Sequence, residues 1–387
     1  MIQKSYKQNK TEVMELYKQY VEFCNKSAVS IDKSIQEQAE KIESEVFNLM
    51  VLGEAKSGKS TFINAFLGDE VVPMDVRQCT SAIIEINRGP EFTLTAHKAG
   101  GGKVYLDKKE EINNFLRQNA AISNKYRNIP VTSINNELLI GKGGRPIPQL
   151  AMKQFIENHA KDNISNLDQD VYNQQIRDYV TETLPRWGEL ITKIEITYPL
   201  SENMQGITII DSPGVGAGGN VGKIAEDYIN KASAIIFVKS LNGQALESSS
   251  FMNFMRTNCP KRQKDTLFLV LTGKGNLNAL DYQSLMEQAK EMYGKDINPE
   301  KIIGIDSLAA LMENKCRKLE TMEKINEFLM ELYENGNAYI PVNMAWMMAK
   351  CDTDAFYEKT ADISNFNRVR NAIETFAQGA NYIRLIG

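Results

Sequence analysis

The sequence predicts an α/β fold in which a mainly parallel sheet carries helices on both faces. Short apolar runs alternate with amphipathic segments of helical periodicity between about residues 46 and 310. Runs such as 47–52, 234–238 and 266–271 are too short for buried helices and are followed by glycine or polar residues. Continuous apolar runs of this kind are typical of strands covered on both faces. Strands that alternate with helices therefore favour the two-faced sheet.

The expected elements follow one another in a regular order. Strands are expected at 47–52, 81–87, 92–96, 191–198, 206–210, 234–238, 266–271 and 301–305. Helices between them are expected at 61–68, 221–230, 246–257 and 280–293. The stretch from about 98 to 188 interrupts the alternation and is rich in Asn, Gln and charged residues. We interpret it as an insertion on the core sheet, with expected helices at 108–119, 149–159 and 168–182.

Both flanks of the α/β region are predicted to be helical. Residues 1–45 repeat apolar side chains every three or four positions, as amphipathic helices do. Such helices either cover the α/β domain or join a helical bundle beside it. Residues 311–387 are also helical by pattern, and the chain stops without a helix-stop signal until its last glycine. We therefore expect an α/β domain at 46–310 with the insertion at about 98–188, flanked by N-terminal helices at 1–45 and C-terminal helices at 311–387.

The composition excludes several functional classes. The 387 residues are 42% hydrophobic and 24% charged, with a net charge of −4. These values describe a globular chain without the basic field of a nucleic-acid-binding protein, so no nucleic acid is expected as a partner. The two histidines, His97 and His159, lie in no motif, which argues against histidine-based hydrolase chemistry.

Cysteine usage and hydropathy predict a cytoplasmic location. The five cysteines are scattered and form no CxxC pair, as expected for free thiols in a reducing compartment. The N-terminus lacks the apolar core of a signal peptide, and no run reaches about 18 apolar residues. Membrane contact is therefore expected to be peripheral, at the inner face of the cell membrane.

A phosphate-binding loop is the clearest motif. The sequence fits G-x-x-x-x-G-K-[ST] at every fixed position, followed by Thr61, and the expected nucleotide-binding residues are Gly53, Glu54, Ala55, Lys56, Ser57, Gly58, Lys59, Ser60 and Thr61. Glycines let backbone N–H groups approach phosphate oxygens at a helix N-terminus. Lys59 is expected to neutralise the β- and γ-phosphates, and the Ser60 hydroxyl to bind Mg²⁺. A strand before the loop and a helix after it weaken the alternative of a chance match.

A second motif supports the first. The apolar strand at 206–210 ends in Asp211-Ser212-Pro213-Gly214. An Asp at the end of a neighbouring strand holds Mg²⁺ in P-loop enzymes, and the backbone N–H of Gly214 is expected to sense the γ-phosphate. Taken alone, Asp211 is better explained as a turn residue that ends a strand, but the phosphate-binding loop upstream and the glycine-rich segment that follows favour the Mg²⁺-binding role.

Thr80 lies between these two motifs, just before an expected strand. A GTPase needs a threonine in this region to bring its hydroxyl and carbonyl to Mg²⁺ and the γ-phosphate. We expect Thr80 to fill this role, with the neighbouring Ser81 as the alternative. Taken in isolation, Thr80 shows only the β-propensity of a residue before a strand.

Base recognition is expected after the strand at 266–271. The sequence there is Thr272-Gly273-Lys274-Gly275-Asn276, where [N/T]-K-x-D would be the guanine-binding pattern. A carboxylate accepts both N–H groups of the guanine edge, whereas Asn276 has one acceptor and one donor group. The mismatch leaves open a preference for another base, or rescue by Asp281 reaching back. Ser307 is expected either to face the base or to cap the following helix.

These segments resemble those of bacterial dynamin-like proteins, in the GTPase (G) domain of the dynamin superfamily. The similar segments are LMVLGEAKSGKSTFINAFLGDEVVP, CTSAIIEI, ITIIDSPGVGAG and ISNFNRVRNAIETF. The resemblance implies binding of GTP/GDP and Mg²⁺, GTP hydrolysis, a homodimer across the nucleotide face, and membrane remodelling. It also implies that 46–310 form a P-loop GTPase domain, and that the flanking helices belong to a partial bundle leading into a missing stalk. Membrane association would be peripheral, through missing regions or a partner protein.

The resemblance also implies how hydrolysis proceeds. Val215 stands where Ras-type enzymes carry a glutamine, in agreement with dynamins. Lys56 stands where family members carry a catalytic loop residue, so it is either a cationic finger supplied in cis or a solvated lysine. With Lys59 and Thr80 it completes the expected catalytic set. Because Asn276 departs from the family pattern, two alternatives stay open: a slow or inactive nucleotide-binding scaffold, and an NTPase that prefers another base.

Overall fold

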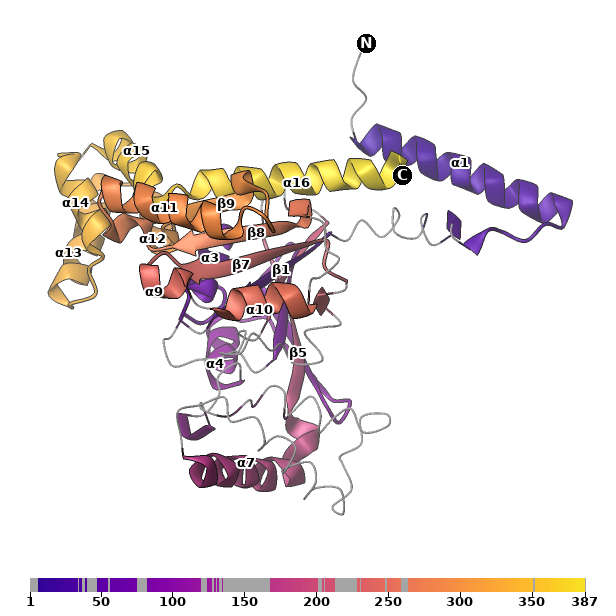
Figure 1. The fold of residues 1–387 in the computed structure, drawn as a ribbon, viewed down its shortest axis with the longest axis horizontal. Coiled ribbons are helices and arrows are strands. Elements are labelled where there is room, and N and C mark those ends of the chain that lie inside the picture. Colours follow the sequence, from indigo (N-terminus) through magenta and orange to yellow (C-terminus); the bar gives the residue numbers. More distant parts are fainter. Residues whose placement is uncertain are drawn as a thin grey trace, which may run out of the picture.

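The structure is a computed structural model. It describes residues 6–33, 35–36, 39, 47–54, 56–74, 82–119, 124–126, 129, 131, 134, 168–200, 204, 206–212, 228–229, 231–247, 249–258, 264–350 and 352–386. Within these residues the strands form one sheet in the order β4-β3-β5-β2-β6-β1-β7-β8-β9 (Figure 1). The strands are β1 Phe47–Gly53, β2 Ile83–Arg88, β3 Thr93–Lys98, β4 Lys103–Leu106, β5 Ile191–Tyr198, β6 Ile207–Asp211, β7 Ala234–Ser240, β8 Leu267–Thr272 and β9 Ile302–Ile305.

Helices precede, connect and follow these strands. The described α-helices are α1 Tyr6–Ser27, α3 Lys59–Leu67, α4 Lys109–Asn119, α7 Gln169–Thr183, α9 Gly243–Leu246, α10 Ser249–Asn258, α11 Ala279–Tyr293, α12 Ser307–Arg317, α13 Met322–Glu334, α14 Ile340–Met348, α15 Thr353–Ser364 and α16 Phe366–Ile386. A 3-10 turn, η5 Lys274–Asn276, follows β8. The expected helix at 149–159 lies outside the described residues.

The pairing pattern confirms the predicted α/β class with a mainly parallel sheet. Strands β6, β1, β7, β8 and β9 are all parallel to their neighbours in this series. Strand β2 is antiparallel to β6 and parallel to β5, and β3 and β4 continue the edge in antiparallel fashion. Strand β4 was not expected, because it falls within the segment interpreted as an insertion.

Helices cover both faces of the sheet, as predicted. Alternate β1 residues point to opposite sides: Leu49 and Val51 join the core beneath α3, α12 and α16, while Met50 and Leu52 join the core beneath α10 and α11. Strand side chains alternate between the faces of a sheet, so a strand that is apolar at every position must be covered twice. This explains why the central strands read as unbroken apolar runs.

Helix α16 packs directly on the helix that follows β1. The Phe366 ring lies 5.7 Å from Phe62 in α3. Arg370 Nη2 donates to the carbonyl oxygens of Ala65 (3.2 Å) and Phe66 (3.4 Å), which end the same helix. A cation at a helix C-terminus satisfies carbonyl groups that have no intrahelical partner. Through these contacts the C-terminal helix holds the far end of α3.

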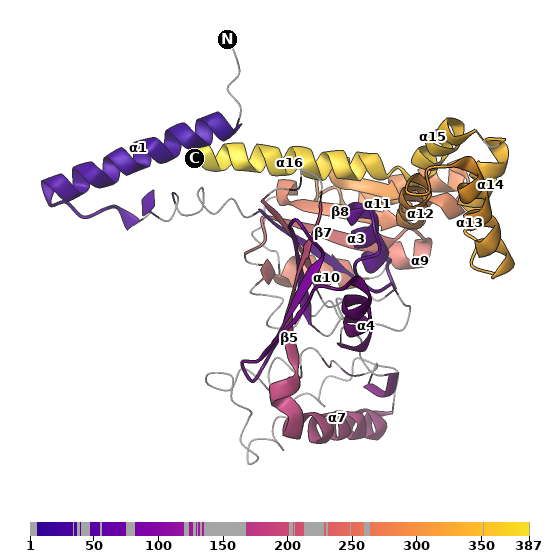
Figure 2. The same ribbon diagram turned by 180° about the vertical axis from the view of Figure 1, so that it is seen from behind.

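Helix α1 lies away from the sheet, beside the C-terminal end of α16 (Figures 1 and 2). The two helices contact each other. Leu16 and Phe23 of α1 remain exposed, at 63% and 64%. The N-terminal helix therefore does not cover the sheet, and its membership of a larger bundle stays a prediction.

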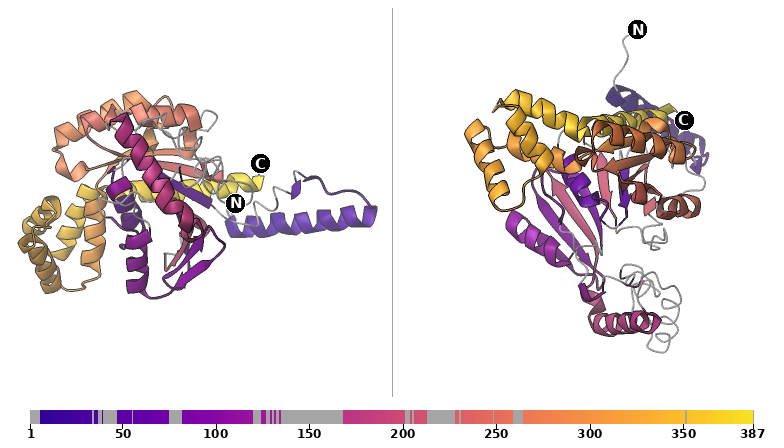
Figure 3. Two further views of the ribbon diagram at one scale, coloured as in Figure 1. Left: turned by 90° about the horizontal axis from the view of Figure 1, so that it is seen from below. Right: turned by 60° about the vertical axis from the view of Figure 1, so that its left-hand side comes forward.

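Helices α12–α15 form a separate apolar cluster at the other end of α16 (Figure 1). The Trp346 and Phe356 rings meet edge-to-face at 5.2 Å in its centre. On the opposite side of the molecule, α7 stands apart from the sheet (Figure 3). Among the described helices, none combines the length and apolar character needed to cross a membrane.

Candidate nucleotide site

Four parallel strands bring the predicted site residues together at the end of the sheet where their carboxyl termini lie. Strand β1 lies between β6 and β7, with Val51 opposite Asp211 and Gly53 opposite Val238. Strand β8 follows β7, with Thr272 opposite Ser240. Because these strands are parallel, their carboxyl ends share an edge, which is where ligands bind in open α/β sheets. Gly53, Asp211 and Thr272 therefore end neighbouring strands of one site.

The loop from β1 to α3 has the backbone of a phosphate cradle. Gly58 (φ 86°) and Lys56 (φ 64°) adopt the left-handed conformation. A Cβ atom at Gly53 would lie 2.6 Å from Ser57 Oγ and 2.8 Å from Val238 O, so only glycine fits there. Gly58, the N-cap of α3, offers no side chain to the N–H groups of the first turn. N–H groups at a helix N-terminus without a side-chain cap are a common binding site for an anion.

Lys59 and Asp211 form the buried centre of the site. Lys59 Nζ contacts Asp211 Oδ1 and donates to Ser212 O at 2.6 Å. Both side chains are buried, with exposures of 9% and 1%. Burial raises the pKa of Asp211, and the Lys59 ammonium opposes this rise. The two residues expected to share the phosphate and the metal are thus already adjacent.

The polar groups of this loop and of its neighbouring strand suit a nucleoside triphosphate with Mg²⁺. Among the described residues, Ser57 Oγ is buried without a hydrogen-bond partner, inside a loop that leaves no room for a side chain at Gly53. Ser60, in the first turn of α3, and Asp211 supply the hydroxyl and carboxylate oxygens that Mg²⁺ prefers. Mg²⁺ usually takes only one or two protein carboxylates, with substrate phosphates and waters completing its shell. Thr61 lies in the same turn of α3. Ala55, Thr80 and Gly214 lie outside the described residues.

The base loop is packed against the helical cluster. Thr272 Oγ1 donates to Ser57 O at 2.8 Å, which ties this loop to the phosphate loop. Lys274 Nζ contacts the carbonyl oxygen of Asp362 and lies 5.5 Å from the centroid of the Tyr282 ring. Burial lowers the pKa of Lys274. Asn276 ends η5 with its side chain exposed.

One expectation about this loop is wrong. Ser307 does not cap α12: Asp306 is the N-cap, and its Oδ1 accepts from Ala309 N at 2.9 Å. Ser307 is instead the first helical residue, buried and without a partner for its hydroxyl among the described residues. The Asp281 carboxylate accepts from Asn278 Nδ2 at 2.7 Å, and its rescue of base recognition stays a prediction. The base-facing role of Ser307 stays a prediction.

Lys239 is a site residue that the sequence argument missed. Its side chain is fully buried at the end of β7, and Nζ donates to Glu54 Oε1 of the phosphate loop at 2.7 Å. Lys239 O also lies 3.4 Å from Thr272 Oγ1. The available signal was a lysine within the run AIIFVKS, since a lysine in a buried strand requires a partner. The partner could not be named without the fold.

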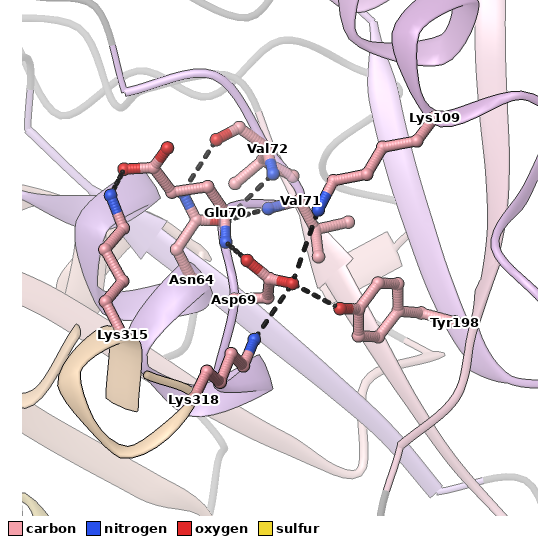
Figure 4. A network of polar contacts seen from close by, with 9 residues as sticks. All are labelled: Asn64, Asp69, Glu70, Val71, Val72, Lys109, Tyr198, Lys315 and Lys318. Atoms are coloured by element: carbon pink, nitrogen blue, oxygen red, sulfur yellow. Dashed lines mark hydrogen bonds and ion pairs between the residues drawn. The ribbon is translucent and has the colours of Figure 1, made fainter. Parts of the chain in front are cut away.

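The segment that leaves α3 is clamped by a polar network (Figure 4). Asn64 Oδ1 accepts from the N–H groups of Val71 and Val72, both at 2.9 Å. Asp69 Oδ2 accepts from Tyr198 OH at 2.8 Å and lies 3.0 Å from Lys318 Nζ. The network joins α3, β5 and α12 immediately before the stretch that contains Thr80.

Asp69 should make stability depend on pH in the acid range. Burial acts to raise the pKa of Asp69, but hydrogen bonds from Lys318, Tyr198 and the Glu70 N–H outweigh it and hold the pKa at about 2. A lowered carboxylate pKa stabilises the fold above the unfolded value of about 4 and loses this effect as pH falls towards 2. The stability gap between wild type and Asp69→Asn should therefore be full at pH 6 and smaller at pH 3.

Urea unfolding at both pH values measures this gap. The exposed Asp296, replaced by Asn, is the matched control and should show no comparable pH-dependent gap. A gap for Asp69→Asn of equal size at pH 6 and pH 3 would contradict the assigned clamp.

A family match covers the phosphate-binding part of this arrangement. The model of the Dynamin family matches residues 49–273, which is more than half of the chain. The chain belongs to the dynamin family. The matched residues run from β1 through the phosphate loop and Asp211 to the start of the base loop, so the predicted dynamin-family GTPase domain and its P-loop GTPase-type fold are confirmed.

Relatives share the dynamin-family region at low identity. A bacterial dynamin-like protein from Nostoc punctiforme is 25% identical over 213 residues, covering 54% of this chain and 23% of the relative. An uncharacterised protein from Caldicellulosiruptor is 24% identical over 307 residues, covering 79% of this chain and 59% of the relative. The chain therefore spans less than two thirds of either relative.

Solved structures of dynamins align with most of the chain. One, from a study of an oligomerised bacterial dynamin pair in the sensing and tethering of membranes, covers 100% of this chain with a TM-score of 0.47 and 16% identity, and 54% of that chain is covered. The LeoA bacterial dynamin GTPase covers 98% of this chain with a TM-score of 0.41 and 13% identity, and 46% of that chain is covered.

Proposed function

We propose that this dynamin-family chain binds GTP with Mg²⁺ and hydrolyses its γ-phosphate. The observation that carries the proposal is the buried contact between Lys59 and Asp211. It places the phosphate-binding cation of the loop against the carboxylate at the end of the neighbouring strand. Family membership supports the choice of GTPase chemistry over other P-loop reactions.

The residues divide the work of phosphoryl transfer. Such a reaction depends on positioning and on neutralising charge at the phosphate oxygens. Lys59 would exchange part of its contact with Asp211 for the β- and γ-phosphates, and the uncapped N-terminus of α3 would face them. Ser60 and Asp211, with Thr80 as a third ligand, would hold Mg²⁺, which supplies charge neutralisation when bound.

Lys56 is the proposed cationic finger. Its backbone is held in the left-handed conformation at φ 64°, in the turn just before α3. A non-glycine residue in this conformation costs free energy, and such strain clusters at functional sites. We further propose that a homodimer forms across the nucleotide face, stimulates hydrolysis and serves membrane remodelling. Membership of the dynamin family supports these roles.

The proposed activity predicts that hydrolysis accelerates with protein concentration. Phosphate release from GTP with Mg²⁺ should show a rate per molecule that rises with concentration, because dimerisation completes the site. Lys56→Gln removes the positive charge but keeps a side chain of similar length on the same backbone at φ 64°. It should therefore lower kcat by about tenfold or more while nucleotide affinity stays near wild type.

Two outcomes would count against these roles. Absence of both hydrolysis and self-association with a non-hydrolysable GTP analogue, at every concentration, would exclude the enzymatic proposal and favour a nucleotide-binding scaffold. An unchanged kcat in Lys56→Gln would make Lys56 a solvated loop lysine. A preference for another base is favoured by one observation, the amide of Asn276 where a carboxylate is usual.

A further inference from the structure

Helix α14 is apolar on both sides, although only one side is buried. One side packs into the cluster of α12–α15 through Val342, Ala345 and Trp346. The other side, at i, i+4, i+7 and i+8, is between 55% and 76% exposed and consists of Ile340, Met344, Met347 and Met348. The helix Ile340–Met348 contains no charged residue. A helix that is apolar all round is normally covered on every side, so the exposed side of α14 suits a partner.

Helix α13 extends this apolar surface. Met330 and Tyr333 lie three residues apart on α13 and are 50% and 68% exposed. Trp346 Nε1 of α14 donates to Asn326 Oδ1 of α13 at 3.1 Å. Asn326 lies one helical turn before Met330, so both lie on the side of α13 that faces α14. The combined surface, which we call the methionine face, consists of Met330, Tyr333, Ile340, Met344, Met347 and Met348.

The methionine face has the features of an interaction surface. Apolar residues that are exposed singly need no explanation, whereas a contiguous group of them marks a binding site. Four of its six side chains are methionine, whose flexible and polarisable thioether adapts to the shape of a partner. The face lies at the end of the molecule opposite α1 (Figures 1 and 2). It therefore does not meet the N-terminal helix of the same chain.

A stripe of carboxylates borders the methionine face. At i, i+4, i+8 and i+11 of α13 stand Glu323, Glu327, Glu331 and Glu334. All four are exposed, and within the part of the chain that the structure describes none of them forms an ion pair. Glu331 directly follows Met330, so the stripe lies about 100° round the helix from that side chain. Like charges at i, i+4 destabilise a helix unless cations approach them.

The charge of this stripe decides which kind of partner fits. A second copy bound through the same face would bring two acidic stripes together, which is unfavourable. An anionic membrane surface would be repelled for the same reason. An amphipathic helix with lysine or arginine beside its apolar stripe would cover the methionines and neutralise the glutamates at the same time.

We propose that the methionine face binds a basic amphipathic helix of a partner protein. Apolar side chains at i, i+3, i+4 and i+7 of that helix would contact the methionines, and its cations would lie along the glutamate stripe of α13. This role goes beyond nucleotide hydrolysis and does not depend on it, because no residue of the methionine face belongs to the nucleotide site.

A pair of synthetic peptides tests the surface. The probe is a fluorescein-labelled helical peptide with leucine at i, i+3, i+4 and i+7 and lysine at the flanking positions, and its partner has glutamate in place of every lysine. Fluorescence anisotropy without nucleotide should show that the lysine peptide binds at least about tenfold more tightly. Its affinity should fall when NaCl is raised from about 50 to about 500 mM.

Three variants locate the binding. Met347→Glu places a charge at the most exposed side chain of the face and should weaken binding of the lysine peptide by about tenfold or more. Glu327→Lys/Glu331→Lys should reverse the preference, so that the glutamate peptide binds more tightly. Leu280→Glu, at an 80% exposed leucine of α11, is the matched control and should bind as wild type does. Circular dichroism identifies a variant that is not folded, and the other variant then decides.

Several outcomes would overturn the proposal. Equal affinity for the two peptides would remove the role of the glutamate stripe, and unchanged affinity in both folded variants would place the binding elsewhere. Sedimentation of wild type without nucleotide as a dimer that Met347→Glu dissociates would assign the face to a second copy. Binding to phosphatidylcholine vesicles that Met347→Glu abolishes would assign it to a lipid surface.

Discussion

Replacing Lys59 with alanine should lower the affinity for GTP by about 100-fold or more and abolish measurable hydrolysis, the largest effect of any single change in the site. Lys59 is the buried cation at the start of α3, and its ammonium already lies against Asp211 and Ser212. Without it, the β- and γ-phosphates would face a buried carboxylate with no neutralising charge. Isothermal titration with a non-hydrolysable GTP analogue and Mg²⁺ measures the loss.

Stability has to be separated from binding in this experiment. Lys59→Ala also leaves Asp211 buried without its cation, and burial then raises the pKa of Asp211 unopposed. The double variant Lys59→Ala/Asp211→Asn removes that charge, so it should recover stability without recovering binding. Replacing the exposed Lys290 of α11 with alanine serves as the surface control. Near-wild-type affinity in Lys59→Ala would refute the assigned phosphate site.

Replacing Glu54 with alanine should destabilise the fold by about 3 kcal/mol, because it strands a fully buried ammonium. Lys239 has no exposed surface, whereas the Glu54 side chain is 22% exposed. The two single variants should therefore differ. Lys239→Met leaves a carboxylate that still reaches water and should cost only about 1 kcal/mol. Chemical unfolding followed by circular dichroism gives both values.

The double variant Glu54→Gln/Lys239→Met tests the origin of this difference. It removes both charges at similar volume, so its unfolding free energy should lie near that of wild type. A Glu54→Ala variant as stable as Lys239→Met would mean that Lys239 finds another partner. Lowered nucleotide affinity in both single variants would show that the pair also shapes the phosphate loop.

Most of the fold followed from hydrophobic patterning alone. The strand expected at 191–198 and the helix expected at 280–293 were found almost unchanged, as β5 and α11. Buried central strands leave a strong signal because every position must be apolar. Strand β4 leaves almost none, since Lys103–Leu106 is an edge strand of alternating exposure inside a polar region.

The site residues could be predicted where the order of strands and helices along the chain determines where each strand ends in the sheet. Lys59 and Asp211 meet because parallel strands end at one edge, a consequence of the α/β alternation. The partner of Lys239, Glu54, comes from an element far along the chain, so no local pattern names it. The Ser307 error has a simple origin, because Asp306 and Ser307 are both good capping residues and the helix begins at Ser307, one residue earlier than a Ser307 cap would require.

The hydrogen bonds from Arg370 to the carbonyl oxygens at the end of α3 fix one point of α16 against that helix, so this contact can act as a pivot between the two. On one side of the pivot, α3 runs a short distance to Lys59; on the other, α16 runs a longer distance to its C-terminal end. From its contact at Ala65 back to Lys59 the distance along α3 is about 9 Å, at 1.5 Å per residue. From Arg370 to Ile386 along α16 it is about 24 Å on the same scale. A tilt of about 10° at this pivot would displace the tip of α16, where α1 lies alongside, by about 4 Å, given the same helical rise. By the ratio of these two lengths, a displacement of Lys59 about this pivot would correspond to one more than twice as large at the end of α16.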